Sequence, residues 1–139
     1  AEQFTPKITS GIVMETGGMK GRKKEITKEA LHETLCKSFS LNSIHSEYGM
    51  TELLSQAYSQ NDGIFTTPRQ MRVYVREYND PLTTIEYGIG AINIIDLANI
   101  NSCCFIATSD LGNVQQDKTF TISGRLDNAD IRGCNLMVI

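Results

Sequence analysis

The sequence lacks any hydrophobic run close to the roughly twenty apolar residues that a membrane-spanning helix needs, so no membrane span is expected. Long basic runs are also missing, because the short run over residues 20–24 is followed at once by Glu25. With a formal net charge of −3 at pH 7, nothing indicates a nucleic-acid partner. The first residues carry neither the basic nor the apolar region of a secretory signal, and we expect a cytoplasmic protein.

Cysteine is scarce and irregularly spaced. The four cysteines form no Cys-x-x-Cys pair and stand near no pair of histidines, which argues against zinc and against a disulfide framework. Cys36 falls in a helical pattern, and Cys103 and Cys104 fall in an apolar strand pattern, where buried thiols are common. Cys134 differs from these three because it follows a cation, Arg132, close to the end of the chain.

A chain of 139 residues with 40% hydrophobic residues can bury a core as one compact unit. Over residues 1–66 we predict a strand at 8–14, a helix with Thr27 as N-cap, a strand at 41–45 and a short helix that begins near Leu53. This order of strand, helix, strand and helix predicts a piece of parallel α/β sheet. Ligands commonly bind at the carboxyl ends of the strands in such sheets.

Residues 67–139 show a different pattern. Met71, Val73 and Val75 alternate with charged or polar residues, as expected for a half-buried strand. Further strands are predicted over residues 88–97, 103–108 and 119–123, separated by turn-forming residues. We therefore predict an α+β fold, in which the parallel piece is followed by a small antiparallel sheet or partial barrel.

One short segment gathers groups suited to a nucleoside triphosphate bound with magnesium. Within five residues it offers a flat ring (Tyr48), a backbone without a side chain (Gly49), a hydroxyl (Thr51) and a carboxylate (Glu52). These groups suit an adenine base, close backbone approach, a phosphate oxygen and the cation, respectively. The same residues are also typical of a turn ahead of a helix, and the segment alone leaves both interpretations open.

This segment resembles the Tyr-Gly-x-Thr-Glu signature of adenylate-forming enzymes, which join ATP to a carboxylic acid. Gly17 and Gly18 resemble their glycine loop against adenine, and Asp110 stands in a Thr-x-Asp-x-Gly element whose aspartate holds both ribose hydroxyls. Arg125 and Asp127 stand in a Gly-Arg-x-Asp element, whose arginine approaches ribose and phosphate and whose aspartate marks a hinge. Each match alone is typical of a turn or loop, whereas four in the correct order favour adenylate-forming ancestry.

Within that superfamily the chain resembles the acyl-protein synthetase (LuxE) family, through residues 15–21, 46–53, 95–99 and 124–135. Members of that family activate a fatty acid as acyl-AMP and then move the acyl group to a cysteine near their own C-terminus. Cys134 matches this position. A thiolate is a fitting acceptor for a mixed anhydride, and Arg132 favours the thiolate by its charge. The alternative is a buried structural cysteine in a final strand.

The resemblance implies ATP and Mg²⁺ as cofactors and a carboxylic acid, typically a fatty acid, as substrate. It implies that Cys134 and Glu52 are catalytic, with Glu52 on the cation, and that Asp127 is a hinge. The histidines His32 and His45 are candidate general bases, but their positions favour a surface or supporting role. The residues implied to bind the nucleotide are Gly17, Gly18, Tyr48, Gly49, Thr51, Asp110 and Arg125.

Two parts of the superfamily pattern are missing from the sequence: the Ser/Thr/Gly-rich loop that clamps the triphosphate and the lysine of a mobile C-terminal domain. We therefore expect a C-terminal portion of a longer enzyme that lacks an N-terminal half and is inactive in adenylation alone. An acyl acceptor protein or a homodimer are further expected partners. Two alternatives stay open, namely part of a phenylacetate–coenzyme A ligase-like acyl-CoA synthetase and a non-catalytic binding or interaction module.

Overall fold

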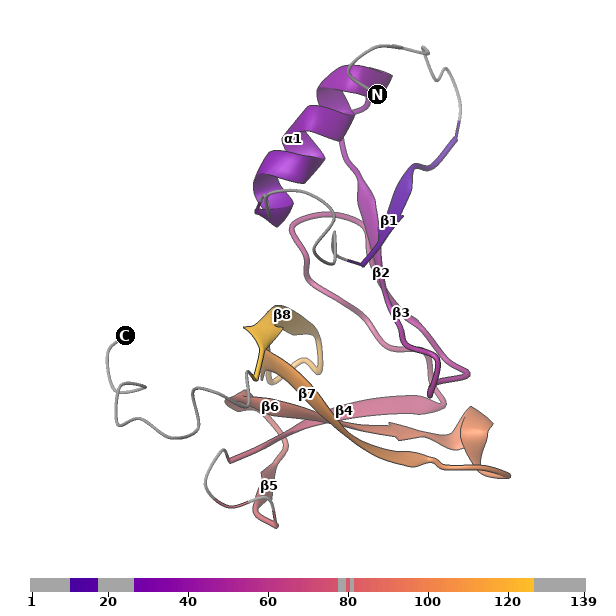
Figure 1. Cartoon of the computed structure of the whole chain (residues 1–139), viewed down its shortest axis with the longest axis vertical. Helices are drawn as coiled ribbons and strands as arrows, with labels where there is room; N and C mark the ends of the chain where they lie inside the picture. Colours follow the sequence, from indigo (N-terminus) through magenta and orange to yellow (C-terminus); the bar gives the residue numbers. More distant parts are fainter. Residues whose placement is uncertain (1–10, 18–26, 78–79, 81, 127–139) are drawn as a thin grey trace.

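The computed structural model of the protein describes residues 11–17, 27–77, 80 and 82–126. These residues form two sheets and one α-helix (Figure 1). No helix among them is long and apolar enough to cross a membrane. In chain order the elements are β1 (Met14–Thr16), α1 (Lys28–Phe39), β2 (His45–Tyr48), β3 (Ala57–Ser59), β4 (Met71–Arg76), β5 (Thr84–Ile85), β6 (Gly88–Asp96), the 3₁₀ turn η1 (Leu97–Asn99), β7 (Phe105–Val114) and β8 (Phe120–Arg125).

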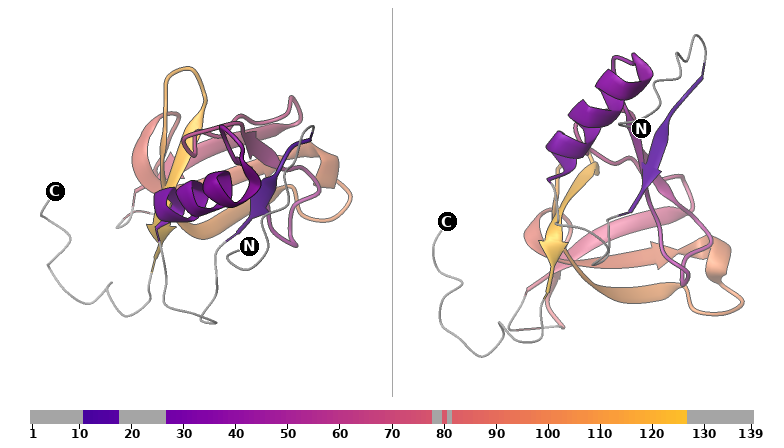
Figure 2. Two further views of the ribbon diagram at one scale, coloured as in Figure 1. Left: turned by 90° about the horizontal axis from the view of Figure 1, so that it is seen from above. Right: turned by 45° about the horizontal axis from the view of Figure 1, so that its top comes forward.

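The first part of the fold is a three-stranded sheet in the order β1-β2-β3. β1 runs parallel to β2, with Thr16 opposite Glu47, and β3 runs antiparallel to β2. α1 connects the two parallel strands and lies beside the three-stranded sheet, and its first residues lie across a cleft from β8 of the second sheet (Figures 1 and 2). Thr27 is the N-cap as predicted, because its side-chain oxygen accepts a hydrogen bond from the N–H of Ala30. The predicted piece of parallel α/β sheet is confirmed.

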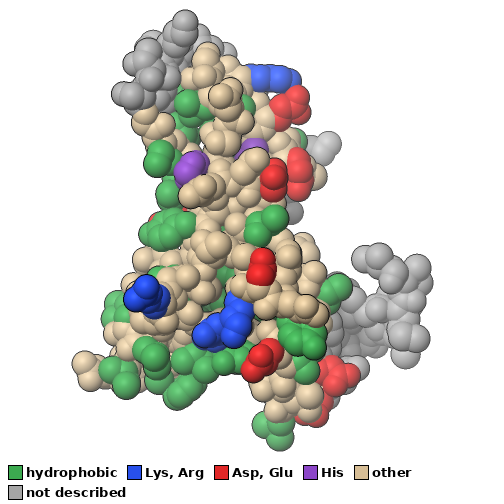
Figure 3. Space-filling view, turned by 180° about the vertical axis from the view of Figure 1, so that it is seen from behind, with side chains coloured by type: hydrophobic (Ala, Val, Ile, Leu, Met, Phe, Trp, Pro, Cys, Tyr) green, Lys and Arg blue, Asp and Glu red, His purple; other side chains and the backbone are tan. Residues whose placement is uncertain are grey.

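The second part is a five-stranded sheet in the order β5-β4-β6-β7-β8, in which all neighbours are antiparallel. In β4 the buried residues alternate as predicted, with Met71, Val73 and Val75 facing the core. The predicted antiparallel sheet is confirmed. Exposed hydrophobic side chains also gather over this sheet, as Figure 3 shows, and they include Ile85, Ile89 and Phe105.

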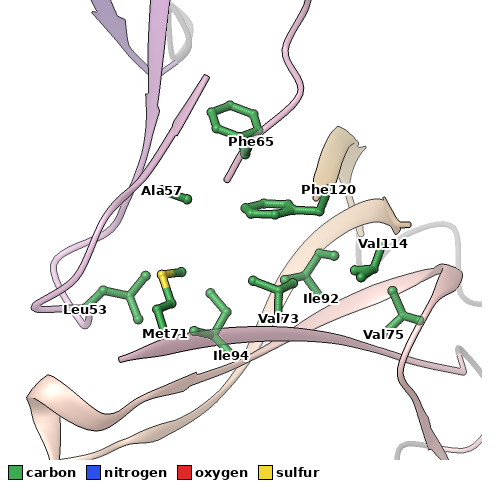
Figure 4. Packing of buried hydrophobic residues seen from close by; sticks show 10 residues of the cluster. All are labelled: Leu53, Ala57, Phe65, Met71, Val73, Val75, Ile92, Ile94, Val114 and Phe120. Atoms are coloured by element: carbon green, nitrogen blue, oxygen red, sulfur yellow. The ribbon is translucent and has the colours of Figure 1, made fainter. Parts of the chain in front are cut away.

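One hydrophobic cluster joins the two sheets. Phe65 and Phe120 stack with ring centroids 5.3 Å apart, and their backbones pair in an isolated β-bridge. Figure 4 shows side chains from the first part facing side chains from the five-stranded sheet. Because these residues are almost fully buried, this cluster supplies the main hydrophobic stabilisation of the described residues. Its members are Leu53, Ala57, Phe65, Met71, Val73, Val75, Ile92, Ile94, Val114 and Phe120.

The predicted short helix near Leu53 is wrong. Residues 51–55 form turns and bends, and Ala57 already starts β3. A helix that begins near Leu53 would first use the N–H groups from about residue 57 onward, but Ala57–Ser59 pair with β2 and the Tyr58 N–H donates to the carbonyl of Thr66. Pairing with other strands has therefore replaced the local helical bonds that the apolar spacing favoured.

Three strand boundaries also differ from the prediction. The first strand lies at Met14–Thr16 instead of 8–14, of which residues 8–10 lie outside the described part. The second begins at His45, where it was predicted to end, so Tyr48 belongs to a strand. The strand predicted at 103–108 is β7 and continues to Val114. Cys103 precedes it and is exposed, contrary to the predicted buried thiol.

Candidate functional site

The parallel pairing of β1 and β2 brings two predicted site residues to one edge of the sheet. Because Thr16 is opposite Glu47, the next residues, Gly17 and Tyr48, are neighbours at the carboxyl ends of the two strands. Gly17 has a φ of 87°, a left-handed backbone conformation that side chains disfavour. Gly18, the second glycine of the predicted loop, lies outside the described residues.

Three predicted site residues meet although they are far apart in the sequence. The Tyr48 hydroxyl donates a hydrogen bond to Oδ2 of Asp110 at 2.8 Å. Nε of Arg125 lies 3.3 Å from Oδ1 of the same carboxylate. Asp110 and Arg125 are opposite each other in the β7–β8 pairing, so the sheet register itself brings these two together. The Asp110 side chain is 16% exposed, whereas that of Arg125 is 72% exposed and reaches toward solvent.

Tyr48 is held by the aromatic part of the core. Its ring packs edge-on against Phe120 at 5.4 Å and at a tilt against Phe65 at 5.9 Å. Burial, followed by the hydrogen bond and charge of Asp110, raises the pKa of the Tyr48 hydroxyl far above its usual value. The hydroxyl therefore stays protonated and acts as a donor toward the Asp110 carboxylate.

The residues around Asp110 explain the spacing of the Thr-x-Asp-x-Gly element. The Thr108 hydroxyl accepts a hydrogen bond from the Asp110 N–H at 3.0 Å and donates to the carbonyl of Ile92 at 2.9 Å. A Cβ added at Gly112 would collide with the Thr121 carbonyl oxygen of β8. The threonine and the glycine of this element therefore have structural roles, which leaves the aspartate as the side chain available to a ligand.

Thr51 and Glu52 lie at an exposed turn between β2 and β3, and Gly49 is also exposed. Among the described residues, no ion pair involves the Glu52 carboxylate, and no group of three His, Cys, Asp or Glu side chains could hold a metal ion. Magnesium is commonly bound by one or two carboxylates together with substrate phosphates. A single carboxylate at this position fits that mode and does not fit a metal site made by protein alone.

The site is an open surface in the part of the chain that the structure describes. One cleft of about 550 Å³ lies between α1, the loop at residues 61–63 and β8, and another of about 360 Å³ lies beside Pro68 and Lys118. Neither cleft is lined by Tyr48, Asp110 or Arg125. The convergence of these three side chains is therefore a matter of direct contact and not of a closed pocket.

One of the two candidate histidines, His32, contacts residues of the small sheet. His32 was expected in a surface or supporting role, and its side chain is 15% exposed, with Nε2 3.4 Å from the buried Ser46 hydroxyl and 3.7 Å from Oε1 of Glu15. Both contacts involve the same nitrogen, so these residues do not form a catalytic triad, in which the acid contacts the other nitrogen. Two further predicted site residues, Asp127 and Cys134, lie outside the described residues.

Two solved structures share this fold. One is apo MatB from Rhodopseudomonas palustris, at 15% identity and a TM-score of 0.56, covering 82% of this chain and 25% of that one. The other is the inhibitor-bound N-terminal domain of FACL13 from Mycobacterium tuberculosis, at 18% identity and a TM-score of 0.50, covering 81% of this chain and 31% of that one. At this identity the likeness shows that the chain shares a fold with part of each of these two proteins.

The match to these two structures covers only part of their length. The chain spans between a quarter and a third of the length of these two structures. No family model matches the sequence, and no curated protein matches it. The adenylate-forming superfamily and the acyl-protein synthetase family therefore both stay predictions from the sequence motifs.

Sequence reasoning missed two polar residues that support the site, Asp96 and Asn99. Both belong to a segment that carried the family resemblance, but no role had been assigned to either. The available signal was a carboxylate directly after the apolar pair at residues 94–95, with an amide three residues later. Charged side chains seldom follow a buried strand without hydrogen-bond partners, so the pattern indicates a tertiary contact.

Proposed function

We propose that this chain is the C-terminal part of an ATP-dependent acyl-activating enzyme, which forms acyl-AMP and passes the acyl group to a thiol. The observation that carries the proposal is the meeting of Tyr48, Asp110 and Arg125, three residues that adenylate-forming motifs single out. The shared fold is a second line of support, because it does not depend on the motifs. The order of the motifs along the chain does not by itself require these side chains to touch.

The Asp110 carboxylate still has capacity for a ribose. Each carboxylate oxygen accepts about two hydrogen bonds. One position on Oδ2 is taken by Tyr48, and Arg125 approaches Oδ1. Each oxygen therefore retains room for one hydroxyl of a vicinal diol. The guanidinium of Arg125 keeps its charge at all relevant pH values and is exposed enough to turn toward a phosphate.

The other residues act by binding and orientation. Gly17 and Tyr48 would flank the adenine at the carboxyl ends of β1 and β2, and the Thr51 hydroxyl would donate to a phosphate oxygen. Glu52 would hold Mg²⁺ jointly with the phosphates. When bound, Mg²⁺ would neutralise negative charge on the phosphate oxygens. Little covalent work falls to these side chains, because positioning of ATP and the carboxylic acid supplies most of the acceleration.

Binding to this chain is tested by the ribose. We expect adenosine to shift the amide NMR signals of Tyr48, Asp110 and Arg125, and 2′,3′-dideoxyadenosine to shift them far less, because it lacks the diol. Asp110→Asn should remove that difference, whereas Asp117→Asn, which changes an exposed aspartate in the β7–β8 turn, should preserve it. Equal shifts by both nucleosides in the wild-type chain would contradict the proposal.

The thiol that accepts the acyl group is the second question. We propose Cys134, because an acyl-AMP anhydride reacts readily with a thiolate. The rival acceptor is coenzyme A, which is favoured by one observation: the two structural neighbours are acyl-CoA synthetases. In the complete enzyme, Cys134→Ser should abolish labelling of the protein by radioactive fatty acid. Thioester release to coenzyme A that persists in the variant identifies the rival.

The exposed hydrophobic residues over the five-stranded sheet fit a chain that is part of a larger protein. Ile85, Ile89 and Phe105 are among them, and such clusters on a surface indicate a contact area. We propose that the rest of the longer enzyme covers this surface, since the chain spans only 25% and 31% of the two neighbours. Homodimerisation through the same surface is the competing outcome. Light scattering on the isolated chain distinguishes the two, because a monomer excludes the dimer.

A further inference from the structure

A buried carboxylate lies directly behind the turn that carries Thr51 and Glu52. Asp96, at the end of β6, is fully buried, and among the described residues no cation pairs with it. Its two oxygens accept hydrogen bonds from the N–H groups of Leu54 at 2.9 Å, Ser55 at 2.8 Å and Ala98 at 3.1 Å, and from the Ser55 hydroxyl at 2.7 Å. Two of these four donors are main-chain groups of the turn.

Asn99 contacts the same turn from the other end of the 3₁₀ segment. Its side-chain amide donates to the carbonyl of Glu52 at 2.8 Å and to the carbonyl of Cys103 at 3.0 Å. Asp96 and Asn99 therefore bind three main-chain groups within residues 52–55. The turn has only one internal backbone bond in addition, from Leu53 N–H to the Met50 carbonyl.

The charge on Asp96 is sustained by its donors. Burial raises the pKa of this carboxyl, but the hydrogen bonds from Ser55 and from the N–H groups of Leu54 and Ala98 outweigh burial and hold the pKa below its ordinary range. A buried carboxylate without a cation is costly unless every acceptor position is used. Burying such a carboxylate costs more free energy than burying an apolar side chain of the same size, so filling space in the core does not explain the presence of Asp96.

We propose that Asp96 and Asn99 are positioning residues, which hold the exposed turn at residues 50–55 so that Thr51 and Glu52 face the triphosphate and its cation. This inference rests on the proposed function and deepens it. The turn has no helical structure of its own, and Thr51 and Glu52 are themselves exposed. Their place is therefore set through the main chain, by hydrogen bonds that begin at the carbonyl of Glu52 and end at the N–H of Ser55.

The first test needs no nucleotide. In the 139-residue chain, Asp96→Asn removes one acceptor oxygen, and Asn99→Ala removes the donor to Glu52 while keeping the buried charge. We expect amide hydrogen exchange in residues 50–56 to accelerate roughly tenfold in each variant, with β4 and β6 unchanged. The matched control is Asp117→Asn, which also removes a carboxylate that accepts from a backbone N–H and a hydroxyl, both of Thr119. Unchanged exchange in Asn99→Ala overturns the proposal, even if Asp96→Asn fails to fold.

The second test separates positioning from general stability. In the complete enzyme, adenosine would contact only the ribose end, near Asp110, whereas Mg-ATP would also use the turn. We expect Asn99→Ala to weaken Mg-ATP roughly tenfold and to leave adenosine within about twofold, because only the turn moves. Parallel losses for both ligands, or no loss for either, overturn the positioning role. If the complete wild-type enzyme binds neither ligand, the proposed function fails and this inference fails with it, while accelerated exchange in residues 50–56 still shows that the two residues hold the turn.

Discussion

The hydroxyl of Tyr48 donates to the carboxylate of Asp110 at 2.8 Å, although the two residues are 62 positions apart in the sequence. This bond joins the end of β2 in the small sheet to the middle of β7 in the large one. The bond orients the carboxylate of Asp110 and holds the aromatic ring of Tyr48 in place at the same time. The candidate site therefore depends on how the two sheets pack and not on either sheet alone.

Tyr48→Phe keeps the ring contacts with Phe65 and Phe120 and removes only the hydrogen bond to Asp110. We expect the free energy of unfolding, measured by urea titration, to fall by about 1 kcal/mol, because a largely buried acceptor loses its partner. Adenosine binding should weaken as well, since Asp110 loses its orientation. The control is Tyr58→Phe at an exposed tyrosine, and equal effects of the two variants would refute a specific role for the Tyr48 hydroxyl.

Acid should weaken the fold in part through Asp96. The pKa of this carboxyl is lower in the folded chain than its ordinary value of about 3.9. Its contribution to stability is therefore complete above the ordinary value and is lost as the pH falls through the lowered folded pKa. Urea titrations from pH 6 downward should show a smaller acid-induced loss for Asp96→Asn than for the wild type. Identical pH profiles would show that Asp96 is not ionised in the folded chain.

The attachment of α1 should depend on Glu15. None of the described helix residues is fully buried, and Glu15 on β1 accepts from Lys28 Nζ at 3.0 Å near His32. Glu15→Gln should accelerate amide exchange in α1 more than in β4 and β6, because it removes the charge on which these contacts converge. Glu33→Gln provides the control, since Glu33 pairs with Lys37 within the exposed surface of the same helix. A larger acceleration of exchange in α1 by Glu33→Gln than by Glu15→Gln would contradict this prediction.

Gly112→Ala should destabilise the five-stranded sheet. The added Cβ would run into the Thr121 carbonyl oxygen and lie 2.9 Å from Cδ1 of Ile92. Because a backbone atom on the paired strand cannot move freely, we expect a loss of about 1–3 kcal/mol in the free energy of unfolding. Gly124→Ala in β8 is the matched control, because nothing lies within 4 Å of a Cβ added there. Equal thermal melting temperatures for the two variants would refute this account of the glycine.

Local patterns predicted a substantial part of the fold. The alternation of Met71, Val73 and Val75 is a property of a strand with one buried face, and the side chain of Thr27 needs only the next turn of backbone to act as a cap. The parallel pairing of β1 and β2 followed from their separation by a helix. The first two features are determined within a few residues, and the third follows from the order of consecutive elements, which explains why the sequence revealed them.

The errors occurred where distant residues compete with local bonds. The apolar spacing after Thr51 favoured a helix, but Ala57–Ser59 pair with β2 and the Tyr58 N–H donates to the carbonyl of Thr66. His32 was expected in a surface or supporting role, and the contact with Ser46 of β2 that the structure shows could not be read from its charged helix neighbours. Neither partner is visible in the local pattern.

The sequence by itself determined which groups are available: a tyrosine, an aspartate and an arginine in ordered motifs. Only the tertiary structure decided that Tyr48 and Arg125 meet on the two oxygens of Asp110, and that Asp96 and Asn99 hold the turn beside them. The physical reason is that a hydrogen bond requires its two atoms within about 3 Å, and packing of the two sheets on one core sets that distance.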